Sequence, residues 1–271
     1  MERMLLATKA DFMDSVRSRV LYGTAVMFAL VAALIAYIIA PGSQGGVPVF
    51  PSTLLGMVLL LGPLVGIYIS YDVLVSKRHT GELKVLLGLP FSRGELVLGS
   101  LLGRSLVLSV LTVTAVAAAF LVSLVTHGLP DLASLLVVLL LGIAMSVVFV
   151  SVSIGISANS RTTSRAAGLA FLVFLLFVFR VWDLLPTLVN TILDQLSAPT
   201  IPQSAVNVYL QLTPHAGLRN LAQPIVPELV GGFQPFVGAP PASQLFGLGV
   251  IFAWGLGPLA LGYLRFGRAD L

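Results

Sequence analysis

The residues whose types and spacing could do chemistry are concentrated in one charged segment, residues 77–104. It reads KRHTGELKVLLGLPFSRGELVLGSLLGR and holds five of the 15 Lys and Arg residues, with Glu82 and Glu95 among them. Its charged side chains can form ion pairs, and the leucines between them can enter an apolar groove. Because long apolar runs flank the segment, it is a polar loop by which a soluble protein can bind a membrane protein.

Three more ionisable residues fall inside the apolar runs, and charges inside a bilayer often mark an ion or proton path. Arg180 and Asp183 are three residues apart, so we expect them on one helical face, where they can neutralise each other as a structural pair, and a gating role is open for them. Asp72 lies about one helical turn from Lys77, and both a structural and a gating role are open for it. No series of acidic residues crosses the apolar runs, as an ion-driven carrier would need.

The sequence lacks the motifs of several common enzyme classes. It has no G-x-x-x-x-G-K-[ST] phosphate loop, no H-E-x-x-H and no G-x-S-x-G. It has no cysteine, which excludes disulfides and thiolate chemistry. Its histidines, His79, His127 and His215, fall in separate loops, where we expect loop or surface positions and no shared metal site. The prediction is a chain that is not an enzyme and holds no cofactor itself.

The elements that must position these residues are membrane spans. With 57% hydrophobic residues, 10% charged residues and a mean hydropathy of +1.02, the chain cannot present a normal water-facing surface. Apolar runs of about 20 residues cross a bilayer as helices. The sequence predicts one all-α integral membrane domain over residues 1–271, with six spans at residues 20–40, 53–75, 105–126, 132–158, 166–189 and 244–264.

The distribution of Lys and Arg predicts the orientation of the spans. Thirteen of the 15 lie before the first span, between spans two and three, between spans four and five, or after the last span. Only Arg219 lies in the loops of the other side, and Arg180 lies inside span five. By the positive-inside rule both termini are cytoplasmic. This asymmetry also explains the pI of about 9.7 without nucleic acid binding.

Two segments outside the spans are expected to fold locally. Residues 1–19 have the amphipathic spacing of a helix in the inner membrane interface, which either only orients span one or also takes part in coupling to a partner. Residues 188–243 hold eight of the 16 prolines and are predicted to form a small external cap. That cap is either a lid over the spans or a docking or gating surface for substrate or an external partner.

The charged segment resembles the loop after span two of the ABC-2 type permeases, the membrane subunits of one class of ATP-driven transporter. The matching positions are Gly81, Glu82, Leu83, Leu86, Leu87, Pro90, Ser92, Arg93, Gly99 and Gly103. The chain departs from the family at residues 77–79, which read Lys-Arg-His in place of Glu-Arg-Glu, and at Ser100, where a Lys is common. Tyr71 and Asp72, with the long segment 188–243, look most like the permease subfamily of nitrous-oxide-reductase maturation.

This resemblance implies a non-catalytic permease subunit that couples ATP hydrolysis in a separate subunit to substrate movement, as an exporter more often than an importer. It implies a short coupling helix within residues 81–89. The leucines that would enter a groove of the ATP-binding subunit are Leu83, Leu86 and Leu87. Pro90 would end that helix, and Ser92 would cap the next one at Arg93, with Glu95 in its first turn. The two helices would form a stiff elbow between spans two and three.

The implied assembly contains two ATP-binding subunits, which hold ATP and Mg²⁺, and a second permease copy, as a homodimer or as a pair with a related permease. It lies in a prokaryotic cytoplasmic membrane in contact with lipid, and an external accessory protein could bind residues 188–243. Two other classes stay open from the residues alone, an autonomous secondary carrier or channel and a membrane scaffold for a multi-subunit assembly. Flux without ATP would favour the carrier or channel.

Overall fold

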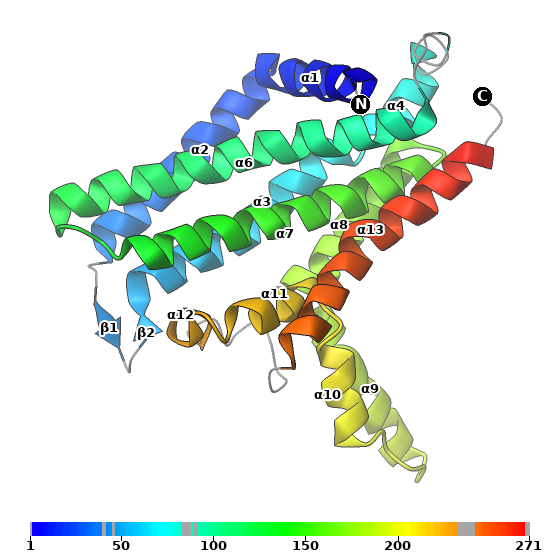
Figure 1. The fold of residues 1–271 in the computed structure, drawn as a ribbon. Coiled ribbons are helices and arrows are strands. Elements are labelled where there is room, and N and C mark those ends of the chain that lie inside the picture. Colours follow the sequence, from blue (N-terminus) through cyan, green and yellow to red (C-terminus); the bar gives the residue numbers. More distant parts are fainter. Residues whose placement is uncertain are drawn as a thin grey trace.

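The computed structural model describes residues 2–39, 42–44, 47–82, 88, 92–231 and 242–268. In these ranges the chain is helical except for one hairpin, in which β1 (Ser43–Gln44) pairs antiparallel with β2 (Val47–Pro48). The long helices lie side by side in a tilted bundle (Figure 1), as the all-α prediction requires apart from that hairpin. The helices in chain order are α1 (Glu2–Arg17), α2 (Arg19–Ile38), α3 (Val49–Ser70), α4 (Val73–His79), α6 (Arg93–Thr126), α7 (Leu132–Asn159), α8 (Thr163–Val178), α9 (Val181–Gln195), α10 (Gln203–Leu210), α11 (Pro214–Ala222), α12 (Pro227–Gly231) and α13 (Gln244–Arg268).

The described part of the chain has five segments that are long and apolar enough to cross a membrane, namely Leu21–Ile38, Val49–His79, Arg93–Thr126, Leu132–Asn159 and Gln244–Arg265. A sixth span forms if α8 and α9 are counted together, but these helices are bent by 74° at their junction. The span predicted at residues 166–189 therefore corresponds to a bent pair of helices and not to a single continuous helix. α8 ends at Val178, and Arg180 has a left-handed backbone conformation (φ 59°) that starts α9 in a new direction.

α3, α6 and α7 form the centre of the bundle. α7 packs against α3 and α13, and α6 packs against α1, α2 and α7. The large side chains that are fully buried in the bundle include Phe28, Leu54, Leu108, Met145, Phe149 and Ile154. Some of the buried hydroxyl groups bond to the carbonyl one turn earlier, as Thr112 does to Leu108 at 2.9 Å. These bonds remove the cost of burying an unpaired donor in an apolar core.

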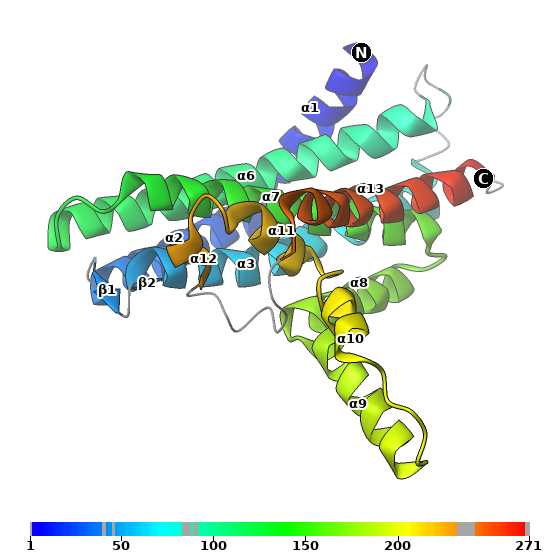
Figure 2. The same ribbon diagram turned by 60° about the horizontal axis from the view of Figure 1, so that its bottom comes forward.

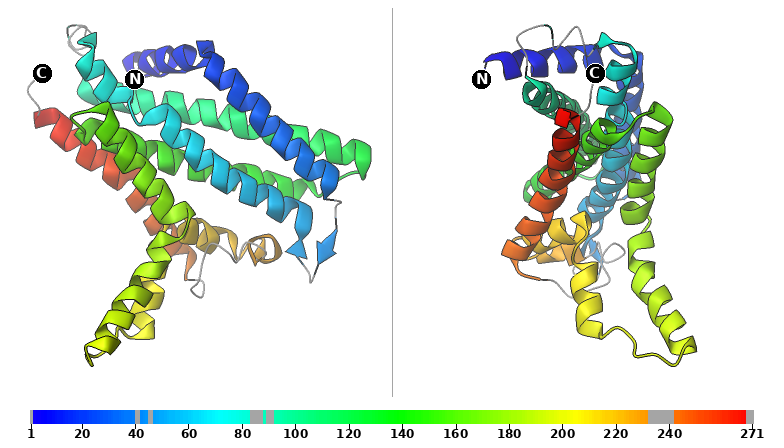
Figure 3. Two further views of the ribbon diagram at one scale, coloured as in Figure 1. Left: turned by 180° about the vertical axis from the view of Figure 1, so that it is seen from behind. Right: turned by 90° about the vertical axis from the view of Figure 1, so that its right-hand side faces the viewer.

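Both ends of the described chain lie at one end of the bundle, beside α4, the start of α6 and the α7–α8 junction (Figures 1 and 3). We call this the cationic end. Its basic residues include Lys77, Arg78 and His79 in the last turn of α4, and Arg161 and Arg165 at the α7–α8 junction. The β hairpin and the α6–α7 connection lie at the opposite end (Figure 1). The assignment of the cationic end to the cytoplasm stays a prediction.

α9 and α10 form a helical hairpin that extends away from the bundle (Figure 2). At its base the rings of Trp182 and Tyr209 stack with centroids 4.5 Å apart, and Trp182 Nε1 donates to the carbonyl of Tyr209 at 3.2 Å. The predicted segment 188–243 therefore begins inside α9, and α10, α11 and α12 follow as short helices. Residues 232–241 lie outside the described ranges. An external location for this segment stays a prediction.

Candidate functional site at the cationic end

The predicted coupling loop is described at its two ends. The predicted coupling residues inside the described ranges are Gly81, Glu82, Ser92 and Arg93. Those outside the described ranges are Leu83, Leu86, Leu87 and Pro90. The geometry of the site is therefore built from the helix termini on both sides of the loop and from the elements that hold them.

A glycine follows the C-terminal cap of helix α4. Gly81 has a φ of 76°, a left-handed conformation that favours glycine, and follows the C-cap residue Thr80. The Gly81 amide donates to the carbonyl of Arg78 at 3.4 Å. The carboxylate of Glu82 lies 3.9 Å from Lys77 Nζ, and both side chains are partly exposed. Such a pair contributes little stability, so the turn is set by the backbone at Gly81.

Helix α6 begins with a capping box. Ser92 Oγ accepts a hydrogen bond from the amide of Glu95 at 3.2 Å, and the Glu95 carboxylate accepts one from the amide of Ser92 at 2.8 Å. The predicted cap at Ser92 and helix start at Arg93 are confirmed. From there α6 continues unbroken for 34 residues, whereas the sequence placed the start of span three at residue 105. A force applied to the loop at residue 92 therefore acts on the whole of α6.

Helix α1 crosses α6 at two glycines. A Cβ at Gly99 would lie 2.6 Å from Ala7 Cβ, and one at Gly103 would lie 2.8 Å from Asp11 Oδ2, so larger residues would push the helices apart. Next to this crossing Asp11 Oδ2 forms an ion pair with Arg104 Nε at 3.0 Å. Burial raises the pKa of Asp11 above its ordinary value of 3.8, and Arg104 opposes the shift. α1 is thus fixed to the first turns of the helix that follows the loop.

Asp72 lies in the two-residue turn between α3 and α4, so the second predicted span consists of two helices. It lines a cleft of about 290 Å³ together with Tyr68, Tyr71, Asp14 and Arg104. Although Asp72 holds the N-cap position of α4, its side chain makes no capping hydrogen bond. The structure therefore places Asp72 on a cleft beside α1 and α6, and its structural or gating role stays a prediction.

The first turn of α4 is capped by a residue of α7. The hydroxyl oxygen of Ser157 accepts hydrogen bonds from the backbone amides of Leu74 and Val75 at 3.1 and 3.2 Å. Such first-turn amides have no partner within their own helix. Ser157 is fully buried, so water cannot replace it. Ser157, which is 83 residues from Leu74 in the sequence, thus takes the capping role that usually belongs to the N-cap residue just before a helix.

The last turn of α4 caps α7 in return. Arg78 donates from its terminal guanidinium nitrogens to the carbonyls of Ala158 at 3.3 Å and Ser160 at 3.4 Å. His79 Nε2 lies 2.8 Å from the carbonyl oxygen of Arg161. A cation at a helix C-terminus is favourable because the carbonyls there carry partial negative charge. We call the contacts of Ser157, Arg78 and His79 the α4–α7 joint.

The predicted ion pair between Arg180 and Asp183 is present, with Nε and Oδ2 2.7 Å apart. Its geometry differs from the prediction, because Arg180 precedes α9 in the left-handed conformation and is not on the face of a continuous helix. The pair closes the bend between α8 and α9. Since α8 separates this bend from the α4–α7 joint (Figure 3), the structure does not bring the pair together with Asp72.

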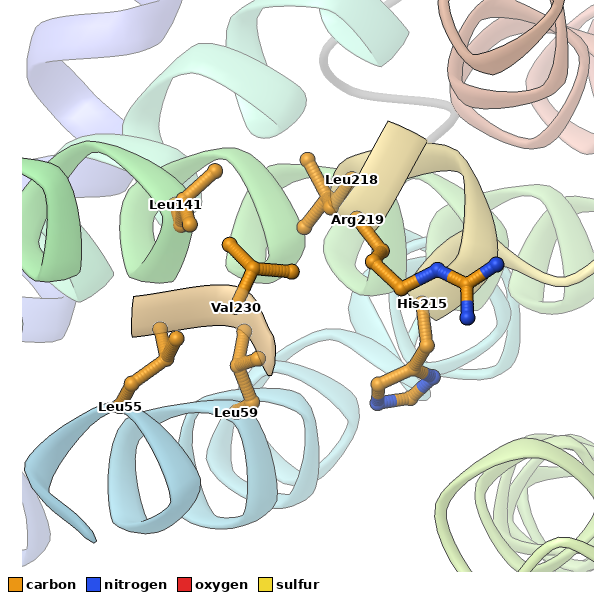
Figure 4. A pocket seen from close by; sticks show the side chains of 7 residues that line it. All are labelled: Leu55, Leu59, Leu141, His215, Leu218, Arg219 and Val230. Atoms are coloured by element: carbon orange, nitrogen blue, oxygen red, sulfur yellow. The ribbon is translucent and has the colours of Figure 1, made fainter. Parts of the chain in front are cut away.

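His215 is buried, so the predicted surface position is wrong for this histidine, whereas His79 and His127 are exposed. It lies on α11 at a small cavity of about 20 Å³, lined mainly by leucines (Figure 4). That volume holds about one water molecule. Burial lowers the pKa of His215 to about 3, so the ring is neutral at pH 7. In the part of the chain that the structure describes, no three His, Asp or Glu side chains gather to hold a metal ion.

The fold and the cationic end define a multi-pass helical membrane protein. A family model described as "ABC-2 family transporter protein" matches residues 5–271. The chain therefore belongs to the ABC-2 transporter family, as the charged segment predicted.

Two curated relatives share the name "Probable ABC transporter permease protein NosY". The protein from Pseudomonas aeruginosa is 28% identical over 180 residues, which cover 63% of this chain and 65% of the relative. The protein from Stutzerimonas stutzeri is 30% identical over 185 residues, which cover 65% of this chain and 66% of the relative. The match thus spans slightly less than two thirds of each relative.

The sequence did not reveal the contacts that hold the site. Asp11 and Arg104 were visible only as charges flanking span one and span three, and Ser157 only as one of several serines in an apolar run. The spacing of Gly99 and Gly103, four residues apart on one helical face, was a signal for a close helix crossing. It did not identify α1 as the partner.

Proposed function

We propose that the chain is the membrane-spanning permease subunit of an ATP-driven ABC transporter, coupling ATP hydrolysis in a separate subunit to substrate movement. The observation that carries this proposal is the match to the ABC-2 family over residues 5–271. The names of the two relatives support it. Because the match covers less than two thirds of those relatives, the activity and partners of the whole transporter are part of the proposal.

The proposed contact with the ATP-binding subunit is a short helix within residues 81–89. Leu83, Leu86 and Leu87 would lie on one side of that helix and enter a groove of the partner. The described termini support this role, because the loop leaves α4 at Gly81 and enters α6 at the capping box of Ser92. A loop held between two well-formed helix ends can transmit force, whereas a loop on frayed ends would absorb it.

The proposed mechanism is mechanical. Binding of ATP and Mg²⁺ would bring two ATP-binding subunits together, and each would displace the loop of one permease copy. The displacement would act on α4 and along the 34 residues of α6, and so tilt the spans. These spans would line a path between two permease copies, which form either a homodimer or a pair with a related permease. Arg104 would draw α1 along with α6 through its ion pair with Asp11.

The proposed orientation puts the cationic end in the cytoplasm of a prokaryotic cell, where ATP is available. The opposite end would face outwards, and the hairpin of α9 and α10 would be available to an external accessory protein or to substrate. Export is the proposed direction. The mainly apolar spans suit a hydrophobic cargo or a mechanical role better than the passage of bare ions.

Co-expression and co-purification with a candidate ABC ATP-binding subunit tests the proposal. The wild-type chain is expected to retain that subunit in detergent, and Leu86→Asp and Leu87→Asp are expected to lose it. The matched control is Leu129→Asp, which places the same charge on an exposed leucine in the α6–α7 connection at the opposite end. Flux in vesicles without ATP, and no retained ATPase, would instead indicate an autonomous carrier or channel.

A further inference from the structure

We infer that the α4–α7 joint makes α4 and the C-terminus of α7 move as one rigid body. Motion of the coupling loop then reaches α7 and α8 through this joint, in addition to reaching spans two and three. The rigid joint is a property of this chain alone, whereas its part in transport rests on the proposed function. Arg78 and Ser157 are the positioning residues of the joint.

The break between α3 and α4 is the first argument. α3 ends at Ser70, and a two-residue turn at Tyr71 and Asp72 precedes α4. α4 is therefore joined to α3 by a turn within the apolar segment Val49–His79, so the contacts of α4 with α7 add to its link with the second span. On the α3 side of the turn the Tyr71 amide donates to the carbonyl of Ile67 at 2.9 Å, and on the α4 side the Ser76 amide donates to the carbonyl of Asp72 at 2.8 Å.

Reciprocal capping is the second argument. The amides of Leu74 and Val75 at the start of α4 bond to Ser157, and Arg78 at its end bonds to the last carbonyls of α7. Both ends of a seven-residue helix are thus held by residues 157–160. Rotating α4 against α7 would expose polar backbone groups in an apolar core, because Val73, Leu74 and Val75 are buried.

The position of the joint is the third argument. It lies directly before the coupling loop, since Arg78 and His79 are followed within three residues by Gly81. It also lies directly before α8, because His79 contacts the carbonyl of Arg161 in the short connection that ends at Thr163. A displacement of the loop therefore reaches the α7–α8 junction through hydrogen bonds and not through a flexible linker.

The absence of native cysteine allows a direct test by spin labelling. Nitroxides at Thr80→Cys and Ser164→Cys, both exposed positions on either side of the joint, report its geometry by pulsed electron paramagnetic resonance. We expect one narrow distance distribution for the chain in nanodiscs. In the complex with the ATP-binding subunit we expect the same distance before and after trapping with ATP and vanadate, while a pair at Thr80 and Leu129 changes.

Variants separate the joint from general packing. Arg78→Gln and Ser157→Ala are expected to lose the narrow peak, and Arg78→Lys, which keeps the charge and one donor nitrogen in place of two, is expected to restore part of it. The matched control is Arg161→Gln, which removes an equal charge from the same connection but keeps the carbonyl that His79 contacts. A broad wild-type distribution, a shift between Thr80 and Ser164 on trapping, or unchanged peaks in both variants would each overturn the inference.

The two proposals fail in different ways. If no ATP-binding subunit binds the chain, the proposed function fails, and the distribution in the lone wild-type chain still decides whether the joint is rigid. If the subunit binds and the pair at Thr80 and Ser164 moves apart on trapping, the joint fails and the proposed function stands. A variant that does not fold leaves the wild-type measurement as the deciding one.

Discussion

The ion pair between Asp11 and Arg104 gives the sharpest prediction for stability. The two atoms are 3.0 Å apart, and the side chains are 5% and 16% exposed. At that distance and an effective dielectric constant of about 20, the direct attraction is about 5.5 kcal/mol. Desolvation of the two ions costs several kcal/mol each and offsets most of this gain. The intact pair is therefore close to neutral for stability, whereas either partner alone would be a buried, uncompensated charge.

We expect Arg104→Gln to destabilise the chain by about 3–5 kcal/mol, because it leaves the buried Asp11 carboxylate without its cation. Asp11→Asn is expected to have little effect at pH 7, because it removes a carboxylate whose ionised form burial already disfavours and leaves an arginine that is partly exposed. The double variant should be more stable than the sum of the single effects predicts, by about 1–3 kcal/mol. The assay is reversible unfolding in mixed micelles followed by circular dichroism. The control is Arg161→Gln, which removes an exposed cation at the α7–α8 junction and is expected to change stability by no more than about 0.5 kcal/mol.

Additive effects in the double variant would refute this reasoning, because two independent sites show no coupling energy. So would an Arg104→Gln cost no larger than that of the Arg161→Gln control. Either result would mean that water reaches the pair and that α1 is held to α6 by packing alone.

Three further predictions follow from the same region. Gly99→Val should separate α1 from α6 and lower the free energy of unfolding by about 1–3 kcal/mol through overpacking. Gly94→Ala, whose Cβ would lie 3.6 Å from its nearest neighbour, should be tolerated, and the same unfolding assay compares the two variants. Because the pKa of Asp11 is raised in the folded chain, the folded state binds more protons than the unfolded state between pH 3.8 and the folded pKa, so stability should fall as pH rises through that range. A pH series of unfolding curves measures this fall, and Asp11→Asn should remove it. Ser92→Ala should remove one cap and cost about 1 kcal/mol, with hydrogen exchange faster in the first turn of α6 and unchanged at its far end.

Local signals predicted local structure well. The spacing of Ser92 and Glu95 predicted the capping box because both partners lie within one helical turn. The pairing of Arg180 with Asp183 was predicted for the same reason, yet the backbone at Arg180 was not, because a left-handed residue inside an apolar run leaves no mark in hydropathy. The same limit applies to the turn at Asp72, which divides a run that reads as one span.

Contacts between distant segments could not be predicted from the residues. Arg104 pairs with Asp11 across more than ninety positions, and Ser157 caps α4 across about eighty, so no spacing rule connects them. His215 illustrates the converse error. Its segment is rich in proline and was expected at the surface, but α11 packs against α7 and α13 and buries the ring. Tertiary packing, and not local pattern, decides which polar residues of a membrane chain are enclosed.

The central claim is that the cationic end couples this chain to ATP hydrolysis. The most direct measurement is the ATP hydrolysis rate of the partner subunit in lipid nanodiscs, alone and with the chain. We predict that the wild-type chain and Leu129→Asp change that rate alike, and that Leu86→Asp returns it to the rate of the isolated subunit. An equal rate with and without the wild-type chain, or a Leu86→Asp chain that acts as wild type does, would contradict the claim.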